Sequence, residues 1–411
     1  MNKPNGAVTL VLLLAAATSL SQFYRVSNSV IGPELASELG LTAREFGFAG
    51  GAFFFALLVA QIPVGMAFDR WGARVTFAGV SGLAVLGALW IAQANSATEL
   101  IAARFLVGLG CSASFMSAVF LCSRWFGVQR FTLVLSWVFA MSNAGTLAAA
   151  TPLAWAAQTI GWRNAFVVLG ILTAVVAALF YALVRDDPPG APPAGRRAES
   201  LAEVWQGLVE VWRTPGLGPV VAMHTFAYAS MVTVLGVWAG PYLHDVHGLD
   251  AVARGNVLFG MGIAQIVGAL SFGPLDHIFG KRKKIVIAGA VVSIAIYGVL
   301  ALLSQPPLEL TVALLMGIPF LSSYAILLVA QGRALFPDRI AGRGVTTVNM
   351  AQVFGATALP ALSGILVGSF AGGAGAAAPE TAYRAVFAML AICSFAGLMV
   401  YLRSKDSRPQ G

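Results

Sequence analysis

Two arginines lie inside long apolar segments, where a charged side chain is costly and is therefore a candidate for function. Arg25 lies within the apolar segment 7–34, and Arg104 lies near the start of segment 98–122. A guanidinium can hold a carboxylate, sulfonate or phosphate by two parallel hydrogen bonds, most strongly in a low-dielectric cavity. We therefore predict that Arg25 anchors an anion, with a structural arginine bonded to helix carbonyls as the alternative. For Arg104 we expect a gating or structural role, with substrate contact as the alternative.

A histidine is the second kind of titratable candidate within an apolar segment. His224 lies early in segment 217–243, and Tyr228 follows one helical turn later on the same face. None of the 17 Asp and Glu residues lies in the middle of an apolar segment. Proton-driven transport usually needs a buried carboxylate or histidine. His224 is therefore a candidate for substrate binding or proton coupling, and a hydrogen-bonded packing histidine is the alternative.

Uncharged polar side chains inside apolar segments either contact a ligand or hydrogen-bond neighbouring helices. Each one, taken singly, is more often a bond between helices than a ligand contact. With that alternative open, the candidate substrate-binding set also includes Tyr24, Asn28, Gln61, Asn143, Tyr228, Gln265, Tyr324 and Asn349. Gln331 and Gln352 are residues of the same kind.

The composition identifies the class of protein that positions these side chains. Of 411 residues, 58% are apolar and 10% are charged, and the mean hydropathy is +0.81. Soluble domains carry about 25% charged residues, so soluble globular, disordered and disulfide-stabilised classes are excluded. The apolar segments are too long and too uniform for an outer-membrane β-barrel. Cys111, Cys122 and Cys393 show no metal or disulfide spacing and are expected to be buried structural residues.

An all-α integral membrane protein with twelve transmembrane helices follows from the lengths of the apolar segments. A spanning helix needs about 20 mostly apolar residues. The first segment has some features of a signal peptide, but its helical pattern continues past the would-be cleavage site. The predicted spans are 7–34, 46–68, 75–94, 98–122, 131–157, 164–184, 217–243, 252–275, 285–303, 308–334, 344–370 and 381–403.

The basic residues predict the orientation of these spans. Nineteen of the 25 Lys and Arg residues fall on the side of the two termini, and Arg25 and Arg104 lie within spans. The other side has four: Arg44, Arg163, Arg254 and Arg384. Basic loops face the cytoplasm, so both termini are predicted to be cytoplasmic, in an inner or plasma membrane. The net charge of +8 is thus interpreted as orientation charge, and we expect no nucleic-acid partner.

The chain is expected to form two six-helix bundles, 1–184 and 217–411, joined by a cytoplasmic linker at 185–216. The linker opens with a polar Pro- and Gly-rich stretch and continues with an amphipathic helix whose apolar positions begin at Leu201 and end at Trp212. The two halves repeat each other weakly: GWRNAF at 161–166 corresponds to AYRAVF at 382–387. Such a duplication is typical of transporters that rock two bundles about a central site.

A charged loop between the second and third spans indicates the family. It reads GMAFDRWGAR at 65–74 and resembles the G-x-x-x-D-R-x-G-R-R loop of the major facilitator superfamily, with Ala73 as a departure. GPLDHIFGKR at 273–282 is a degraded second copy, and RFLVGLG at 104–110 resembles the R-x-x-x-G-x-G element. The resemblance implies that charges of these loops hold the cytoplasmic side shut; the alternative is that they only set topology. The gating set is Asp69, Arg70, Arg74, Arg104 and Asp276.

A second resemblance concerns the substrate. The string FYRVSNSVIGP at 23–33 is similar to the first span of the organic anion transporters of that superfamily. In that branch the arginine binds the carboxylate or phosphate of the substrate, and Arg25 occupies its position. Tyr24 stands where the branch usually has an aspartate, so proton coupling at this position is in doubt.

The predicted function is movement of a small organic anion, carboxylate-like, by alternating access in secondary active or facilitative transport. The alternative is a multidrug or hydrophobic-compound exporter of the same superfamily, although segment 142–152 matches its Gly- and Pro-rich motif poorly. A transporter-like sensor is a third possibility. The sequence contains no enzyme motif and no metal-ligand cluster, and we expect no cofactor. The expected partners are a small-molecule substrate, a coupling proton or counter-anion, and the lipid bilayer, with the protein as a monomer.

Overall fold

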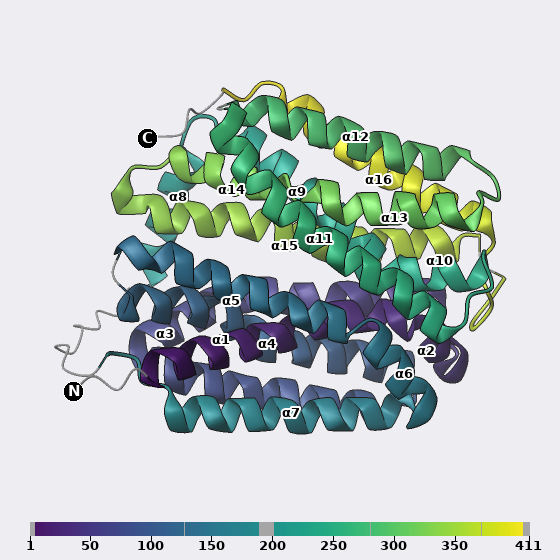
Figure 1. Ribbon diagram of the computed structural model, residues 1–411, viewed down its shortest axis with the longest axis horizontal. Helices are drawn as coiled ribbons and strands as arrows, with labels where there is room; N and C mark the ends of the chain where they lie inside the picture. Colours follow the sequence, from purple (N-terminus) through teal and green to yellow (C-terminus); the bar gives the residue numbers. More distant parts are fainter. Residues whose placement is uncertain (1–4, 127, 189–200, 280, 371, 406–411) are drawn as a thin grey trace. The chain divides into compact units, whose positions relative to one another are not determined.

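The computed structural model describes residues 5–126, 128–188, 201–279, 281–370 and 372–405. Within these ranges the chain folds into α-helices and one short π-helical segment, without a β-strand (Figure 1). Contacts divide the helices into two compact units. Unit 1 comprises Met1–Asn28 and Ala52–Glu199, and unit 2 comprises Ser29–Gly51 and Ser200–Gly411. The expected division at 184 and 217 remains a prediction.

The helices that contribute to unit 1 come from the N-terminal half of the chain. They are α1 (Asn5–Val30), the larger part of α3 (Ala43–Gln93), α4 (Ala97–Trp125), α5 (Val128–Ala148), α6 (Thr151–Thr159) and α7 (Trp162–Leu183).

Unit 2 contains α2, the first turns of α3 and all helices after the linker. The helices are α2 (Gly32–Leu39), α8 (Leu201–Trp212), α9 (Leu217–Thr233), the π-helical segment η1 (Val234–Trp238), α10 (Ala239–Asp245), α11 (Ala251–Phe279), α12 (Arg282–Leu302), α13 (Leu308–Ser322), α14 (Ala325–Ala334), α15 (Asp338–Gly368) and α16 (Glu380–Tyr401). Thus α8 occupies the segment where the sequence predicts an amphipathic linker helix.

The all-helical membrane fold predicted from the sequence is confirmed. The described residues contain eleven helical stretches long and apolar enough to cross a membrane. One of them, α3, has 51 residues and breaks at Gly72, whose φ of 82° and ψ of 173° are not helical. At about 1.5 Å per residue, α3 is long enough for two crossings. The break at Gly72 therefore reconciles eleven helical stretches with twelve expected spans.

Four of the expected spans are interrupted, because prolines remove backbone donors from a helix. The first span ends at Val30, and α2 restarts at Gly32 with Pro33 in its first turn. The fifth span breaks before Pro152, the seventh contains the π-helical segment ahead of Pro241, and the tenth breaks a few residues after Pro319.

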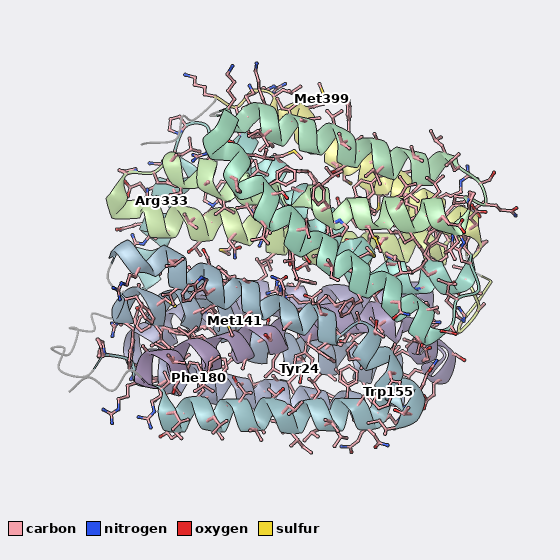
Figure 2. The ribbon with its side chains drawn as sticks, viewed as in Figure 1. Tyr24, Met141, Trp155, Phe180, Arg333 and Met399 are labelled. Atoms are coloured by element: carbon pink, nitrogen blue, oxygen red, sulfur yellow. The ribbon has the colours of Figure 1, made fainter. Side chains whose placement is uncertain are left out.

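Large apolar side chains cover the outside of both units, as expected for helices that face lipid. Trp155 of α6 is 63% exposed and Met399 of α16 is 49% exposed (Figure 2). In water such surface would be unfavourable, because burial of apolar area stabilises a soluble fold. In a bilayer the hydrocarbon chains cover it instead.

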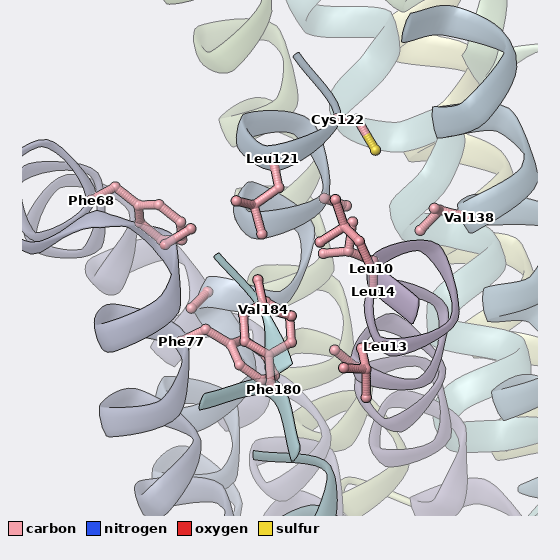
Figure 3. Packing of buried hydrophobic residues seen from close by; sticks show 14 of the residues in the cluster. Leu10, Leu13, Leu14, Phe68, Phe77, Leu121, Cys122, Val138, Phe180 and Val184 are labelled. Atoms are coloured by element: carbon pink, nitrogen blue, oxygen red, sulfur yellow. The ribbon is translucent and has the colours of Figure 1, made fainter. Parts of the chain in front are cut away.

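The core of unit 1 is an apolar cluster contributed by α1, α3, α4, α5 and α7. Phe77 and Phe180 pack against each other with ring centroids 4.2 Å apart and planes tilted by 39°, and the leucines of α1 pack nearby (Figure 3). The corresponding core of unit 2 includes Met223 of α9 and Tyr324, both almost fully buried. These clusters fix the helices that carry the candidate site residues.

The R-x-x-x-G-x-G element of α4 has a packing role. A Cβ added at Gly108 would overlap the carbonyl oxygen of Phe53, and one added at Gly110 would overlap the backbone nitrogen of Ala84. Both residues that would be overlapped lie in α3, so the glycines allow α3 and α4 to approach backbone to backbone. This is the small-residue packing that membrane helices use in place of a hydrophobic driving force.

We expect Gly110→Ala to lower the free energy of unfolding by about 1–3 kcal/mol, because the added methyl group has to separate two helix backbones. Thermal unfolding of the purified protein measures the effect. Gly82→Ala is the matched control, since a Cβ at Gly82 meets nothing within 4 Å. Equal stability of the two variants would show that the close approach of α3 and α4 has no energetic importance.

Candidate functional site

Arg25 lies near the C-terminal end of α1 and is partly buried within unit 1. Its guanidinium carbon stands 5.7 Å from the ring centroid of Phe54, a fully buried residue of α3. A guanidinium at this distance from an aromatic ring is attracted to it by a cation–π interaction.

Arg104 is 3% exposed and lies close to the same aromatic pair. Its guanidinium carbon is 5.8 Å from the Phe53 ring, which packs edge-on against Phe54 with centroids 5.3 Å apart. Its Nη2 donates a hydrogen bond to the carbonyl oxygen of Tyr24 at 3.3 Å. Arg104 therefore bonds a helix carbonyl, which is the contact expected of a structural or gating arginine.

The two arginines form one basic cluster in unit 1. Both guanidiniums lie within electrostatic range of the Cys111 thiol. The sequence of α1 contains no acidic residue, and α4 contains Glu99 alone, in its first turn. Two positive charges on neighbouring helices, with that shortage of acidic residues, create a field that favours an anion.

Tyr24 and Asn28 flank Arg25 on α1, and both are fully buried. The Tyr24 hydroxyl shares a 2.9 Å hydrogen bond with the Thr173 hydroxyl of α7, so Tyr24 ties α1 to α7. Asn28 is 1% exposed, and neither of its amide atoms has a hydrogen-bond partner within the described part of the chain. Burying such a group costs about 1–3 kcal/mol. Asn28 lies one turn beyond Arg25, so a polar ligand bound there would relieve this cost.

The other candidates of unit 1 are less distinctive. Gln61 of α3 and Asn143 of α5 are both partly buried. The Asn143 amide donates to the carbonyl oxygen of Phe139 in its own helix at 3.0 Å. Their contact with substrate stays a prediction.

The charged loop at 65–74 lies around the break in α3. Asp69 and Arg70 are exposed, and Arg70 stands over Trp71 at 5.7 Å. The backbone N–H of Arg74 donates to the Asp186 carboxylate at 2.8 Å, and its guanidinium contacts both the carbonyl and the ring of Tyr181 at the end of α7. The loop is therefore tied to the last turn of α7 and to the start of the linker.

Asp69→Asn is expected to reduce the transport rate several-fold while the protein still inserts and folds, because a charge of the gating loop is removed from an exposed position. The measurement is uptake into vesicles at matched protein content. Arg163→Gln, at the other end of unit 1, serves as the control. Wild-type uptake by Asp69→Asn would mean that the carboxylate only sets topology.

In unit 2 the structure brings together three polar candidates from two helices. His224 of α9 is 1% exposed, and the side chain of Gln352 of α15 lies close to its ring. The Gln352 amide nitrogen donates to Asn349 Oδ1 at 2.8 Å. Within the residues that the structure describes, neither ring nitrogen of His224 completes a hydrogen bond. A role of His224 in substrate binding or proton coupling, and the alternative of a packing histidine, both stay predictions.

The remaining candidates of unit 2 lie elsewhere in it. Tyr228 is partly buried one turn after His224 on α9, and Gln265 of α11 accepts a weak bond from Ser323 through its backbone oxygen. Tyr324 is buried in the apolar core of the unit. Asp276 lies in α11, and its side chain falls outside the described residues.

An ion pair in unit 2 was not predicted from the sequence. Arg254 of α11 is 1% exposed, and its guanidinium donates to the Glu34 carboxylate of α2 and to the carbonyl oxygen of Leu249. Both charged residues lie next to predicted span ends, where they look like ordinary surface charges. Their separation of 220 positions leaves no local sequence signal for the pairing.

A cavity of about 400 Å³ opens beside this ion pair, lined by residues of α2, α10, α16 and the loop before α16. Asp245, in its wall, accepts hydrogen bonds from the Tyr383 hydroxyl and the backbone N–H of Ala378. The carboxylates of the lining are thus engaged in tying helices together. None of the predicted substrate-binding residues lines this cavity.

Comparison with known proteins identifies the family. The model of the Major Facilitator Superfamily matches residues 12–331. The chain belongs to the Major Facilitator Superfamily. It is therefore a secondary transporter and not an enzyme, and the sequence resemblance is confirmed.

The chain is also similar to transporters of known sequence and shares its fold with a solved structure. The probable galactarate/D-glucarate transporter of Bacillus subtilis (strain 168) is 30% identical over 48% of this chain, and the chain spans 44% of that relative. The D-galactonate transporter of Escherichia coli O6:H1 is 24% identical, with 94% of each chain covered. A bacterial homolog of the human lysosomal transporter Spinster has the same fold, with a TM-score of 0.78 at 16% identity, covering 98% of this chain and 97% of that one.

Proposed function

We propose that this superfamily member moves a small organic anion of the carboxylate type across the cytoplasmic membrane by alternating access, with Arg25 as the anchor for the anion. The supporting observation is the basic cluster of unit 1. Arg25 and Arg104 lie on neighbouring helices against the Phe53–Phe54 pair, and acidic residues are scarce on both helices.

Asn28 adds a feature that suits a hydroxylated carboxylate. Its buried amide lies on the same face of α1 as Arg25, three positions later, and offers one donor pair and one acceptor. A guanidinium for the carboxylate and an amide for a neighbouring hydroxyl would together bind a hydroxy acid. A hydrophobic drug would leave both groups without partners.

The relatives support the same class of substrate. The two described above are named for galactarate, D-glucarate and D-galactonate, which are all polyhydroxylated carboxylates. The bias of basic residues toward one side of the predicted spans supports cytoplasmic termini, which we propose as the orientation.

A thermal-shift screen of the purified protein tests this function. The panel holds carboxylates, including D-galactonate and D-glucarate, with phosphates, sulfonates and cationic dyes. A ligand at 100 times its Kd should stabilise the folded protein by about 2.7 kcal/mol. Stabilisation by hydroxy acids is the expected result. Stabilisation by the dyes alone would favour the drug exporter and contradict the anion proposal.

A further inference from the structure

The imidazole of His224 is an unusual buried group. Neither Nδ1 nor Nε2 has a hydrogen-bond partner in the described residues, although the side chain is 1% exposed. Native proteins rarely bury a polar group in this way, and each case calls for an explanation. Histidine is also the side chain whose charge changes most readily between about pH 5 and 8. A change of charge is therefore the first role to consider.

The helix α15 presents an acceptor to this imidazole. The Gln352 side chain lies beside the ring, and one N–H of its amide donates to Asn349. The amide keeps a second N–H and its carbonyl oxygen, and of these only the oxygen can accept a hydrogen bond. An imidazolium has an N–H on both ring nitrogens, so it can donate to this oxygen whichever nitrogen faces it, whereas a neutral ring can do so in one tautomer only. The pair Gln352–Asn349 is therefore compatible with a charged His224.

Other titratable groups near α9 do not replace His224 in this role. The elements packed against α9 are η1, α13, α14, α15 and α16. On α9 and these elements the titratable or charged residues besides His224 are Tyr228, Glu309, Arg333, Asp338, Arg339, Arg343, Glu380, Tyr383, Arg384, Cys393 and Tyr401, and Tyr324 directly precedes α14. The charged members lie in the terminal turns of their helices, apart from Arg343, which precedes Gln352 by nine residues or about 13 Å of helix. Tyrosine and cysteine side chains in general ionise only above pH 7.

We propose that His224 is the residue that binds the coupling proton of this transporter, with the Gln352 amide oxygen accepting its N–H and Asn349 orienting that amide. This inference rests on the proposed function. A proton from water on one side of the membrane would bind the imidazole and form imidazolium. After the change in access, the imidazolium would release the proton to water on the other side. An anion carries one or more negative charges, so the two ligands partly neutralise each other and each raises the affinity for the other. Coupling of this kind needs no contact between anion and histidine.

Transport by purified protein in liposomes separates coupling from binding. Labelled D-galactonate and D-glucarate are the probes in two assays, equilibrium exchange without a gradient and accumulation driven by an imposed pH gradient. Wild-type protein should do both. His224→Gln should lose accumulation, reaching only the external concentration, and its ratio of accumulation to exchange should fall below that of the wild type. His244→Gln is the matched control, because His244 is a half-exposed histidine of the same unit.

Each outcome of this experiment decides between the proposals. Accumulation by His224→Gln equal to the wild type would overturn the proton site. Wild-type exchange without gradient-driven accumulation would also overturn it, while leaving the anion function intact. If the wild type exchanges neither probe, the proposed anion function fails and the proton site fails with it.

A direct measurement of the imidazole keeps the test independent of the folding of His224→Gln. In the variant His244→Gln/His247→Gln/His277→Gln the ¹⁵N spectrum of histidine reports on His224 alone. We expect the fraction of imidazolium at a given acidic pH to rise when D-galactonate is added in excess. A ring that stays neutral throughout with both anion and acid present would contradict the proposal.

Discussion

Arg25→Gln is expected to lose anion binding almost completely, and Arg25→Lys is expected to weaken it more than tenfold, at least about 1.4 kcal/mol. Glutamine removes the positive charge from α1. Lysine keeps the charge, but its compact ammonium cannot make two parallel bonds to one carboxylate. The measurement is the thermal shift of each variant with and without D-galactonate. Arg44→Gln is the control, because Arg44 also stands over a phenylalanine ring but is exposed.

A structural role for Arg25 gives a different pattern of melting temperatures. Loss of an anion-binding charge should leave the ligand-free protein as stable as the wild type or more stable, since a charge at membrane depth carries an insertion cost. Loss of a structural arginine should orphan buried acceptors and lower the melting temperature, with partial rescue by lysine. If ligand-free Arg25→Gln melts much earlier while its folded fraction still binds the anion normally, the anchor assignment is wrong.

Glu34→Gln is expected to cause the largest loss of stability, about 3 kcal/mol in the free energy of unfolding. The substitution leaves the Arg254 guanidinium, which is 1% exposed, without its carboxylate. The Glu34 side chain is 35% exposed, but the Arg254 guanidinium is buried, so removing Glu34 costs more than replacing both residues because the remaining charge is uncompensated. Denaturant unfolding of the purified protein measures the difference.

A double-mutant cycle checks that the loss belongs to the pair. Glu34→Gln/Arg254→Met removes both charges and should recover most of the stability lost by Glu34→Gln alone. Glu38→Gln, one turn further along α2, is the matched control for a glutamate in the same helix. Additive effects of Glu34→Gln and Arg254→Met would mean that the two side chains do not depend on each other.

Local physical properties made the membrane fold predictable. A run of apolar residues about 20 positions long has one stable outcome in a bilayer, because every backbone group must be bonded within the helix. The break between the second and third spans was also local, since Gly72 adopts a φ of 82° that other residues avoid. The interior breaks, such as the one after Pro319, were less predictable, because a proline can bend a helix without ending it.

Individual site residues divide in the same way. The sequence identified Arg25 and His224, because a charged or titratable side chain in an apolar segment stands out from its neighbours. It did not predict the hydrogen bond by which Tyr24 ties α1 to α7. That hydrogen bond depends on which face of α1 meets Thr173 of α7, and the sequence of one helix does not specify which helices pack against it.

By itself, then, the sequence determined an all-helical membrane transporter of the Major Facilitator Superfamily, together with the rare polar residues inside its spans. Hydropathy, span length and loop motifs are properties of contiguous residues, so no packing information was needed. The tertiary structure alone decided that Arg254 is a buried partner of Glu34, and that His224 faces Gln352 without completing a hydrogen bond. These features depend on which helices pack together and at what rotation, and that is settled by contacts between residues far apart in the chain.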